Sequence, residues 1–246
     1  MSIDMNRKQF IGSMFATVAG SCILPSFGKS EKSEFDKCKE DILYFVDNYL
    51  EVNDPLNGKL KMSPQQREYL KRISTTPDYF FCAKGRQVGI STANNVFAYW
   101  KSIFFGPDQY VFIVEPNMGM KERLKNMYGG VSNSGAFMPL PNRVHFITPR
   151  TMMTHDLTNE NNTYILDEFD FWDEYSIDRL SKQDLDLFLG GLLFKSTYPN
   201  DFKGTRSKFI VPSSICSFDQ YFSLIMRHID KSRCLVLPSP TRGLKA

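Results

Sequence analysis

The fold is decided by the stretch Tyr79-Phe80-Phe81-Cys82-Ala83-Lys84-Gly85-Arg86-Gln87-Val88-Gly89-Ile90-Ser91-Thr92. Its first five residues are apolar and mostly aromatic, which predicts a short buried strand. Gly85 and Gly89 follow and predict a tight loop. The next apolar residues fall on one face of a predicted helix, and they are Ala93, Val96, Phe97, Trp100, Ile103 and Phe104. The stretch therefore reads as strand, glycine-bearing loop and helix.

The same alternation of strands and helices extends outward along the chain. Further strands are predicted at 110–114, 144–147, 164–166 and 209–211, and further helices at 42–50, 64–73, 121–128, 185–193 and 218–229. Ser63-Pro64 predicts the start of one helix, residues 30–41 are interpreted as a charged linker, and Asn53 to Gly58 as a turn. Such alternation predicts an α/β fold with a mostly parallel sheet covered by helices on both faces.

Composition narrows the class of protein. The 246 residues suit one α/β domain, and 42% apolar with 23% charged residues exclude wholesale disorder. No stretch reaches the ~18 apolar residues of a membrane span, which excludes a multi-span membrane protein. The net charge of +3 neither requires nor excludes a nucleic-acid partner. Five scattered cysteines without a CxxC pair favour reduced thiols over zinc or disulfides.

The first 33 residues are interpreted as a leader with two alternative roles. Arg7 and Lys8 precede a diluted apolar stretch, 10–24, and Pro25 follows, which resembles a secretory signal. A docking helix is the alternative. The proposed domain then spans 34–240, with a tail at 241–246.

Lys84 to Ser91 can be aligned with the phosphate-binding pattern G-x-x-x-x-G-K-[ST]. Gly89 and Ser91 match the second glycine and the hydroxyl that binds magnesium, whereas Lys84 and Ile90 stand where the pattern has glycine and lysine. Loop N–H groups and a helix N-terminus attract phosphate, and Lys84 and Arg86 can supply the cation. The alternative is a basic turn between a strand and a helix.

A second pattern lies at the end of the strand that contains Thr163 to Leu166. The strand runs into Asp167 and Glu168, which is typical of a Walker B motif. We expect Asp167 to hold magnesium and Glu168 to polarise an attacking water. Two acids at a strand end also occur by chance, but together with the upstream loop they predict an additional-strand P-loop ATPase core.

These motifs resemble those of the large terminase subunits of tailed bacteriophages. The stretch Lys84 to Thr92 resembles the family's phosphate loop K-A-R-Q-x-G-I-S-T, in which isoleucine commonly replaces the lysine. Residues 164–169 resemble its Walker B strand, and 38–49 its motif C-x-x-D-P-x-Y-F-x-x-x-Y, with Ile42 at the proline position. Gln66 matches the family's adenine-reading glutamine. The resemblance covers residues 35–225, and it implies a P-loop NTPase, RecA-like fold.

The resemblance gives each matched residue an expected role. Glu168 and Arg86 are the expected catalytic residues, Ser91 and Asp167 the expected metal ligands. The nucleotide is expected to contact Gln66, Lys84, Gly85, Arg86, Gln87, Gly89, Ile90, Ser91 and Thr92. Ser213 and Ser214 are expected coupling residues, although Pro212 is displaced from the family's S-T-P or S-S-P pattern. Their alternative role is to cap a strand end.

The implied function is an ATP-hydrolysing motor subunit that translocates double-stranded DNA into the capsid, with ATP and Mg²⁺ as cofactors. The implied partners are the portal protein, the small terminase subunit, further copies in a ring and a separate nuclease chain. No nuclease domain is expected, because few residues follow the coupling segment. The implied location is the host cytoplasm, which argues against secretion. The alternatives are a helicase-like or other P-loop DNA-dependent ATPase, or a non-catalytic nucleotide-binding assembly module of a split terminase.

Several other side chains offer weaker candidates. The three histidines are isolated in the sequence, so they predict neither a metal site nor a catalytic triad. The acidic residues at 170–174 are interpreted as a solvated loop, with a second metal site as the alternative. Lys203, Arg206 and Lys208 are interpreted as surface charges, with contact to DNA phosphates as the alternative.

Overall fold

The computed structural model describes residues 32–50, 53–54, 58–59, 61–85, 88–114, 143–155, 157–168, 207–214, 226–227 and 229–238. Residues 1–31 of the expected leader (1–33), the tail 241–246 and the helices expected at 121–128 and 185–193 lie outside these residues, as does most of the helix expected at 218–229. Within the described part, no helix combines the length and the apolar character that crossing a bilayer requires.

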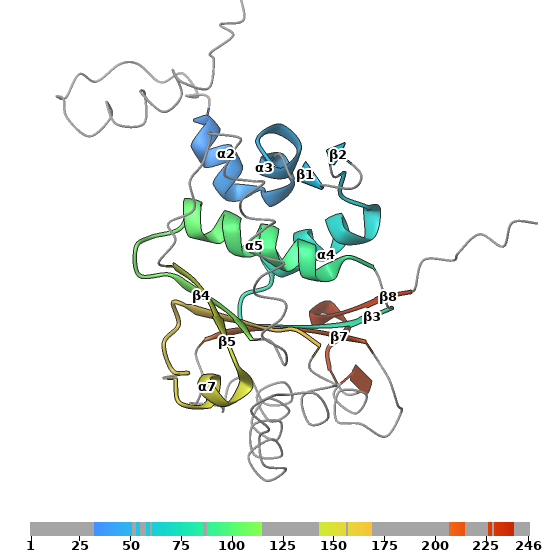
Figure 1. The fold of residues 1–246 in the computed structure, drawn as a ribbon. Helices are drawn as coiled ribbons and strands as arrows, with labels where there is room; N and C mark the ends of the chain where they lie inside the picture. Colours follow the sequence, from blue (N-terminus) through green and yellow to red (C-terminus); the bar gives the residue numbers. More distant parts are fainter. Residues whose placement is uncertain are drawn as a thin grey trace, which may run out of the picture.

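A six-stranded sheet forms the centre of the molecule (Figure 1). Its strands are β3 (Tyr79–Lys84), β4 (Tyr110–Val114), β5 (Val144–Ile147), β6 (Asn162–Leu166), β7 (Lys208–Ser214) and β8 (Cys234–Leu237). The spatial order is β5-β4-β6-β7-β3-β8, and every neighbouring pair is parallel. The structure therefore confirms the α/β class and the parallel sheet, in an order that is compatible with a RecA-like core.

Strand β3, which lies between β7 and β8, is buried on both faces, as strands of parallel sheets usually are. Phe80 and Cys82 point into the core on one face, and Phe81 and Ala83 into the core on the other face. This alternation explains why the sequence shows an unbroken apolar run there instead of an alternating pattern.

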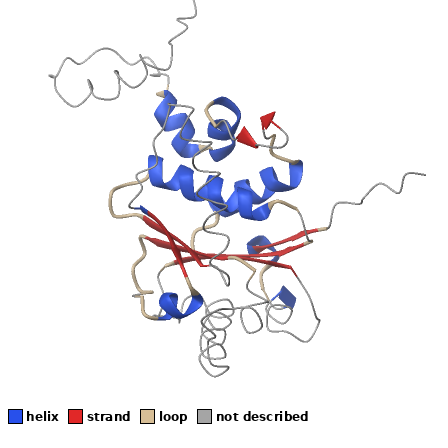
Figure 2. Ribbon diagram, in the orientation of Figure 1, coloured by secondary structure: helices blue, strands red, loops and turns tan. Residues whose placement is uncertain are grey.

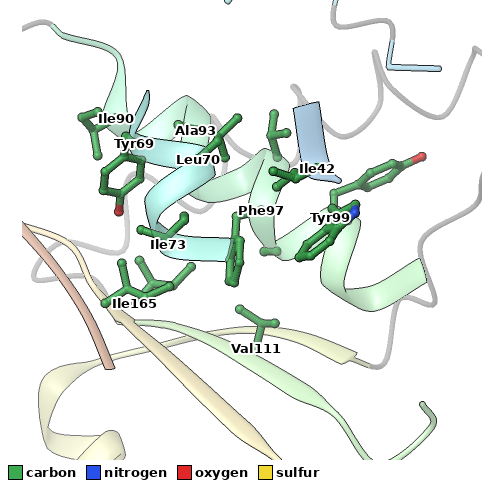
Figure 3. Close-up of a cluster of buried hydrophobic side chains, with 14 of the residues drawn as sticks. Ile42, Tyr69, Leu70, Ile73, Ile90, Ala93, Phe97, Tyr99, Val111 and Ile165 are labelled. Atoms are coloured by element: carbon green, nitrogen blue, oxygen red, sulfur yellow. The ribbon is translucent and has the colours of Figure 1, made fainter. Parts of the chain in front are cut away.

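Helices of the described part lie above one face of the sheet (Figure 2). They are α2 (Glu34–Glu40), α3 (Ile42–Asn48), α4 (Pro64–Thr75) and α5 (Ile90–Phe104). Figure 3 shows Leu70 and Ile73 of α4 and Phe97 of α5 above Val111 and Ile165 of the sheet, so these two helices make the direct contact. The short helix α7 (Pro149–Met153) lies on the opposite face.

Helix α4 begins as the sequence predicts. Ser63 is its N-cap and accepts a hydrogen bond from the backbone N–H of Gln66, at 3.2 Å, and Pro64 is the first helical residue. The side chain of Gln66 in turn accepts from the N–H of Ser63, at 2.8 Å. This reciprocal pair is a capping box, which satisfies two N–H groups that the helix itself cannot.

The interpretation of residues 30–41 as a linker is wrong, because α2 occupies most of that segment. Its surface is charged, but Cys38 is buried, and the ring of Phe35 lies 5.2 Å from that of Phe104 on α5. Two apolar anchors therefore hold a helix whose other residues resemble a linker. The two ends of the turn expected from Asn53 to Gly58 pair as antiparallel strands, β1 (Asn53–Asp54) and β2 (Gly58–Lys59), and residues 55–57 lie outside the described residues.

The interpretation of Lys208 as a surface charge or a DNA contact is also wrong. Its side chain is buried, and its ammonium group donates to the carbonyl oxygens of Ile73, at 2.5 Å, and of Thr76. Both carbonyls belong to the C-terminal end of α4, so Lys208 caps that helix. Burial lowers the pKa of Lys208 to about 7, because the charged form is poorly solvated there. Lys203 and Arg206 lie outside the described residues.

Candidate functional site

Three neighbouring strands bring the candidate residues to one edge of the sheet. β7 lies between β6 and β3. Since all three are parallel, their carboxyl ends meet at the same edge, which is where α/β proteins usually bind ligands. Lys84 ends β3, Ser214 ends β7, and Asp167 and Glu168 directly follow β6.

The hydroxyl of Ser91 and the carboxylate of Asp167 meet at this edge. Ser91 is in the first turn of α5, and its Oγ donates to Oδ2 of Asp167 at 2.9 Å. Asp167 is buried, and burial raises the pKa of its carboxyl group to about 6, although Lys84 and the Ser91 hydrogen bond act in the opposite direction. The two oxygen groups that the sequence pattern assigns to one metal site therefore lie in contact with each other.

Lys84 and Glu168 form an ion pair beside them. Nζ of Lys84 lies 2.5 Å from Oε1 of Glu168 and 3.4 Å from Oγ of Ser214. The backbone N–H of Ser214 donates to the other carboxylate oxygen of Glu168, at 3.3 Å. The Lys84 side chain is 7% exposed and that of Glu168 is 30% exposed, so the carboxylate reaches towards solvent while the ammonium group lies deeper.

The backbone around Glu168 departs from regular strand geometry. Glu168 has φ +50°, a left-handed conformation that costs a residue with a side chain of order 1–3 kcal/mol. The pairing of β6 with β7 ends at Ile165 and Ile210, two residues before Pro212. Beyond that point the two strands no longer pair, and the Glu168 side chain accepts the Ser214 N–H. Pro212, which lacks an N–H, therefore sits past the last rung of this ladder.

The N-terminus of α5 carries the glycine that the phosphate-loop pattern requires. Gly89 is the N-cap, with φ +76°, and no side chain caps the helix there. The first N–H groups of a helix need acceptors, and an anion can supply them. The side chain of Ile90, at the lysine position of the pattern, is buried in the core and does not take the place of that lysine. Among the described residues, Lys84 is the cation at this edge.

The remaining candidates are placed as follows. Thr92 lies in the first turn of α5, and Ser213 is buried in β7 opposite Ala83. The N–H of Gly85 donates to the carbonyl of Leu237 on β8, at 2.8 Å, so this N–H extends the pairing of β3 with β8. Gln66 contacts the carbonyl oxygen of Gly89, at 2.9 Å. Arg86 and Gln87 lie outside the described residues.

Sequence reasoning missed two features of this site. The first is β8, whose carbonyl at Leu237 engages the loop at Gly85. Its short apolar run, 234–237, is the only signal in the sequence. The second is the contact between Ser214 and Glu168, which depends on β7 lying beside β6. No local pattern shows which strands become neighbours.

The arrangement has the chemical features of a metal-dependent phosphate site. A hydroxyl and a carboxylate are oxygen ligands of the kind that Mg²⁺ prefers, and a lysine and a helix N-terminus attract anions. A second carboxylate lies within reach of the same edge. No protein-family model matches the chain, and no curated protein matches it either.

Proposed function

We propose that the chain is a magnesium-dependent ATPase with a P-loop site, acting as the motor subunit that moves double-stranded DNA into a phage capsid. The observation that carries the ATPase proposal is the contact between Ser91 and Asp167, at 2.9 Å, beside the Lys84–Glu168 pair. Four residues from three segments of the chain thereby converge at one helix N-terminus. The motor role rests on the resemblance of the motifs to large terminase subunits.

The residues fit a magnesium ion. The Ser91 hydroxyl and the Asp167 carboxylate would hold it, since both are oxygen donors and already lie in contact. When bound, the ion supplies positive charge that offsets the charge of the terminal phosphates. Asp167 must be ionised to act as a ligand, which its pKa of about 6 permits at neutral pH.

The protein supplies the other groups that the reaction requires. Lys84 would pair with phosphate oxygens in place of the lysine that the pattern puts at Ile90. Glu168 would accept a proton from a water molecule that attacks the γ-phosphorus, while the bond from that phosphorus to the bridging oxygen breaks. For this step Lys84 must turn from Glu168 towards the phosphate, which would free the carboxylate to act as the base.

The resemblance also supports the wider setting. The proposed partners are double-stranded DNA, the portal protein, the small terminase subunit and further copies of this chain in a ring. Arg86 would act as the transition-state cation, and Ser213 and Ser214 would couple hydrolysis to movement. The contact of Ser214 with Glu168 supports the coupling role, because it links β7 to the proposed catalytic carboxylate. The proposed location is the host cytoplasm.

The test is an ATPase assay on the full chain with and without double-stranded DNA. Glu168→Gln should abolish turnover and retain ATP binding, because the amide keeps the size of the side chain but cannot accept the proton. Glu68→Gln, on the exposed face of α4, is the matched control and should keep the wild-type rate. DNA-stimulated hydrolysis that survives Glu168→Gln would sink this mechanism.

A second candidate is a non-catalytic nucleotide-binding module. It is favoured by the ion pair that engages Glu168 and by the buried Ile90 at the lysine position. This candidate predicts ATP binding without turnover, even when portal protein and DNA are present. A helicase-like ATPase would instead hydrolyse ATP and separate DNA strands, which a strand-unwinding assay detects.

A further inference from the structure

The side chain of Gln66 is engaged at both of its polar atoms. Its Oε1 accepts the N–H of Ser63, at 2.8 Å, and its Nε2 donates to the carbonyl oxygen of Gly89, at 2.9 Å. Only this orientation of the amide satisfies both neighbours, since an N–H needs an acceptor and a carbonyl needs a donor. Gln66 is 7% exposed, so both contacts are shielded from water.

The Gly89 carbonyl is an unusual place for a side chain to bind. It is the N-cap carbonyl of α5 and also accepts the N–H of Ala93, at 3.3 Å. A Cβ on Gly89 would lie 2.4 Å from Nε2 of Gln66, so the amide can approach only because this residue is glycine. The positive φ of Gly89 favours glycine for a second reason, because a Cβ would crowd the residue's own backbone in this conformation.

Holding this carbonyl also fixes the N–H on the other side of the same peptide unit. In a planar trans peptide, the carbonyl of Gly89 and the N–H of Ile90 point in opposite directions. The Gly89 carbonyl points along α5 and towards Gln66. The N–H of Ile90 therefore points out of the helix N-terminus, where Ser91 and Asp167 form the proposed phosphate site.

We infer that Gln66 is a positioning residue of the phosphate site: through the Gly89 carbonyl it aims the Ile90 N–H at a bound phosphate. The inference rests on the proposed function but differs from the expected adenine contact. The ligand group that benefits is the phosphate chain, whatever base is attached to it.

A second contact makes α4 a firm support for this arrangement. Tyr69, one turn after Gln66, donates its hydroxyl to Oδ1 of Asn94 on α5, at 2.6 Å. Both side chains are buried. The two helices are thus joined by the Gln66–Gly89 hydrogen bond and by the Tyr69–Asn94 hydrogen bond, so the backbone of α4 is held beside the start of α5.

The test compares a ligand that has a base with one that has none. Binding of Mg-ATP and of Mg-tripolyphosphate to the full chain is measured by calorimetry, below the unfolding temperature of every variant. Gln66→Met removes both amide contacts at similar size and should weaken both ligands by a similar factor, about tenfold. Ser63→Ala removes the hydroxyl of the capping box but leaves Gln66 on Gly89, and should keep both affinities within about twofold.

The outcomes separate this inference from the proposed function. If wild-type protein binds both ligands and Gln66→Met loses only ATP, Gln66 reads the base and the inference is overturned. It is also overturned if Ser63→Ala weakens tripolyphosphate as much as Gln66→Met does, since the effect then belongs to the helix cap. Wild-type protein that binds neither ligand refutes the proposed ATPase and the inference together.

If the Gln66→Met variant does not fold, the same binding measurement is made with Gln66→Glu. The carboxylate still accepts the Ser63 N–H, and glutamate is a common partner in capping boxes, but it cannot donate to the Gly89 carbonyl. Binding is compared with the wild type in 1 M salt, where a Debye length of about 3 Å screens the added charge. Weakened tripolyphosphate binding is expected, and wild-type affinity would overturn the inference.

Discussion

At the scale of single residues, the carboxyl group of Asp167 shows how burial changes the pKa of a candidate site residue. Burial raises its pKa to about 6, while the ammonium group of Lys84 and the hydroxyl of Ser91 limit the rise. An ionised carboxylate in such a place is costly unless a cation compensates it. This cost to the stability of the free protein fits the proposed role of Asp167 as a metal ligand, since functional sites often break the rules that stabilise the rest of a protein.

This cost predicts a pH-dependent effect of Asp167→Asn. The folded-state pKa of about 6 lies above the usual 3.8, so the stability that the protonated group contributes is full below about pH 4 and is lost as the pH rises through 6. Asparagine does not ionise. The variant should therefore gain about 3 kcal/mol over the wild type between pH 4 and pH 8, in the absence of nucleotide. Urea unfolding at several pH values measures this, and a difference that does not change with pH contradicts it.

Helix α5 has a glycine next to each of its ends, and the two glycines differ in whether the structure requires them. Its N-terminus begins at Gly89, where φ is +76° and Gln66 leaves no room for a Cβ. Beyond its C-terminus, Arg143 donates to the carbonyls of Ser102, Phe105 and Gly106, and a Cβ at Gly106 would meet open space. The glycine at the start is thus required by geometry, and the glycine after the end is not.

The two glycines make a matched pair for mutation. Gly89→Ala should destabilise the protein by about 2 kcal/mol or more, because alanine is strained at this φ and its Cβ displaces Gln66. Gly106→Ala should leave stability unchanged or raise it by up to about 1 kcal/mol, since it restricts only the unfolded chain. Chemical denaturation of both variants gives the comparison. If both variants lost the same free energy of unfolding, the left-handed conformation of Gly89 would not be the cause of the loss.

For the whole molecule, strand order is the decisive feature. Lys84, Ser91, Asp167, Glu168 and Ser214 are spread over 131 residues of sequence, yet the order β6-β7-β3 gathers them at one edge. A ligand bound there would contact three strand ends and one helix at the same time. Its binding should therefore stabilise segments that are distant in sequence.

Hydrogen exchange tests this arrangement. Adding Mg-ATP should slow amide exchange at 88–92, 166–168 and 213–214 together, because all three segments border the proposed site. Residues 34–48, in α2 and α3, cover the same face of the sheet but do not border the site, and they serve as the internal control. Protection confined to 88–92 would show that β6 and β7 do not share the nucleotide site.

Local patterns in the sequence predict a large part of this structure. The apolar run before Lys84, the glycine at 89 and the helix after it are readable because strand burial, turn geometry and helical periodicity each leave a short-range signal. The pair Asp167-Glu168 is readable for the same reason. Segments without such a signal were missed or misread: α2 has only two apolar anchors, and β8 has four residues.

The sequence by itself determined most of the elements, the parallel sheet and the chemical groups of the candidate site. Only the tertiary structure decided which groups meet. It placed β7 between β6 and β3, so that Ser214 contacts Glu168, turned Lys84 towards Glu168, buried Lys208 beneath α4 and set Gln66 against Gly89. The physical reason is that strand order and side-chain partners follow from packing between distant segments, which the spacing of residues along the chain does not specify.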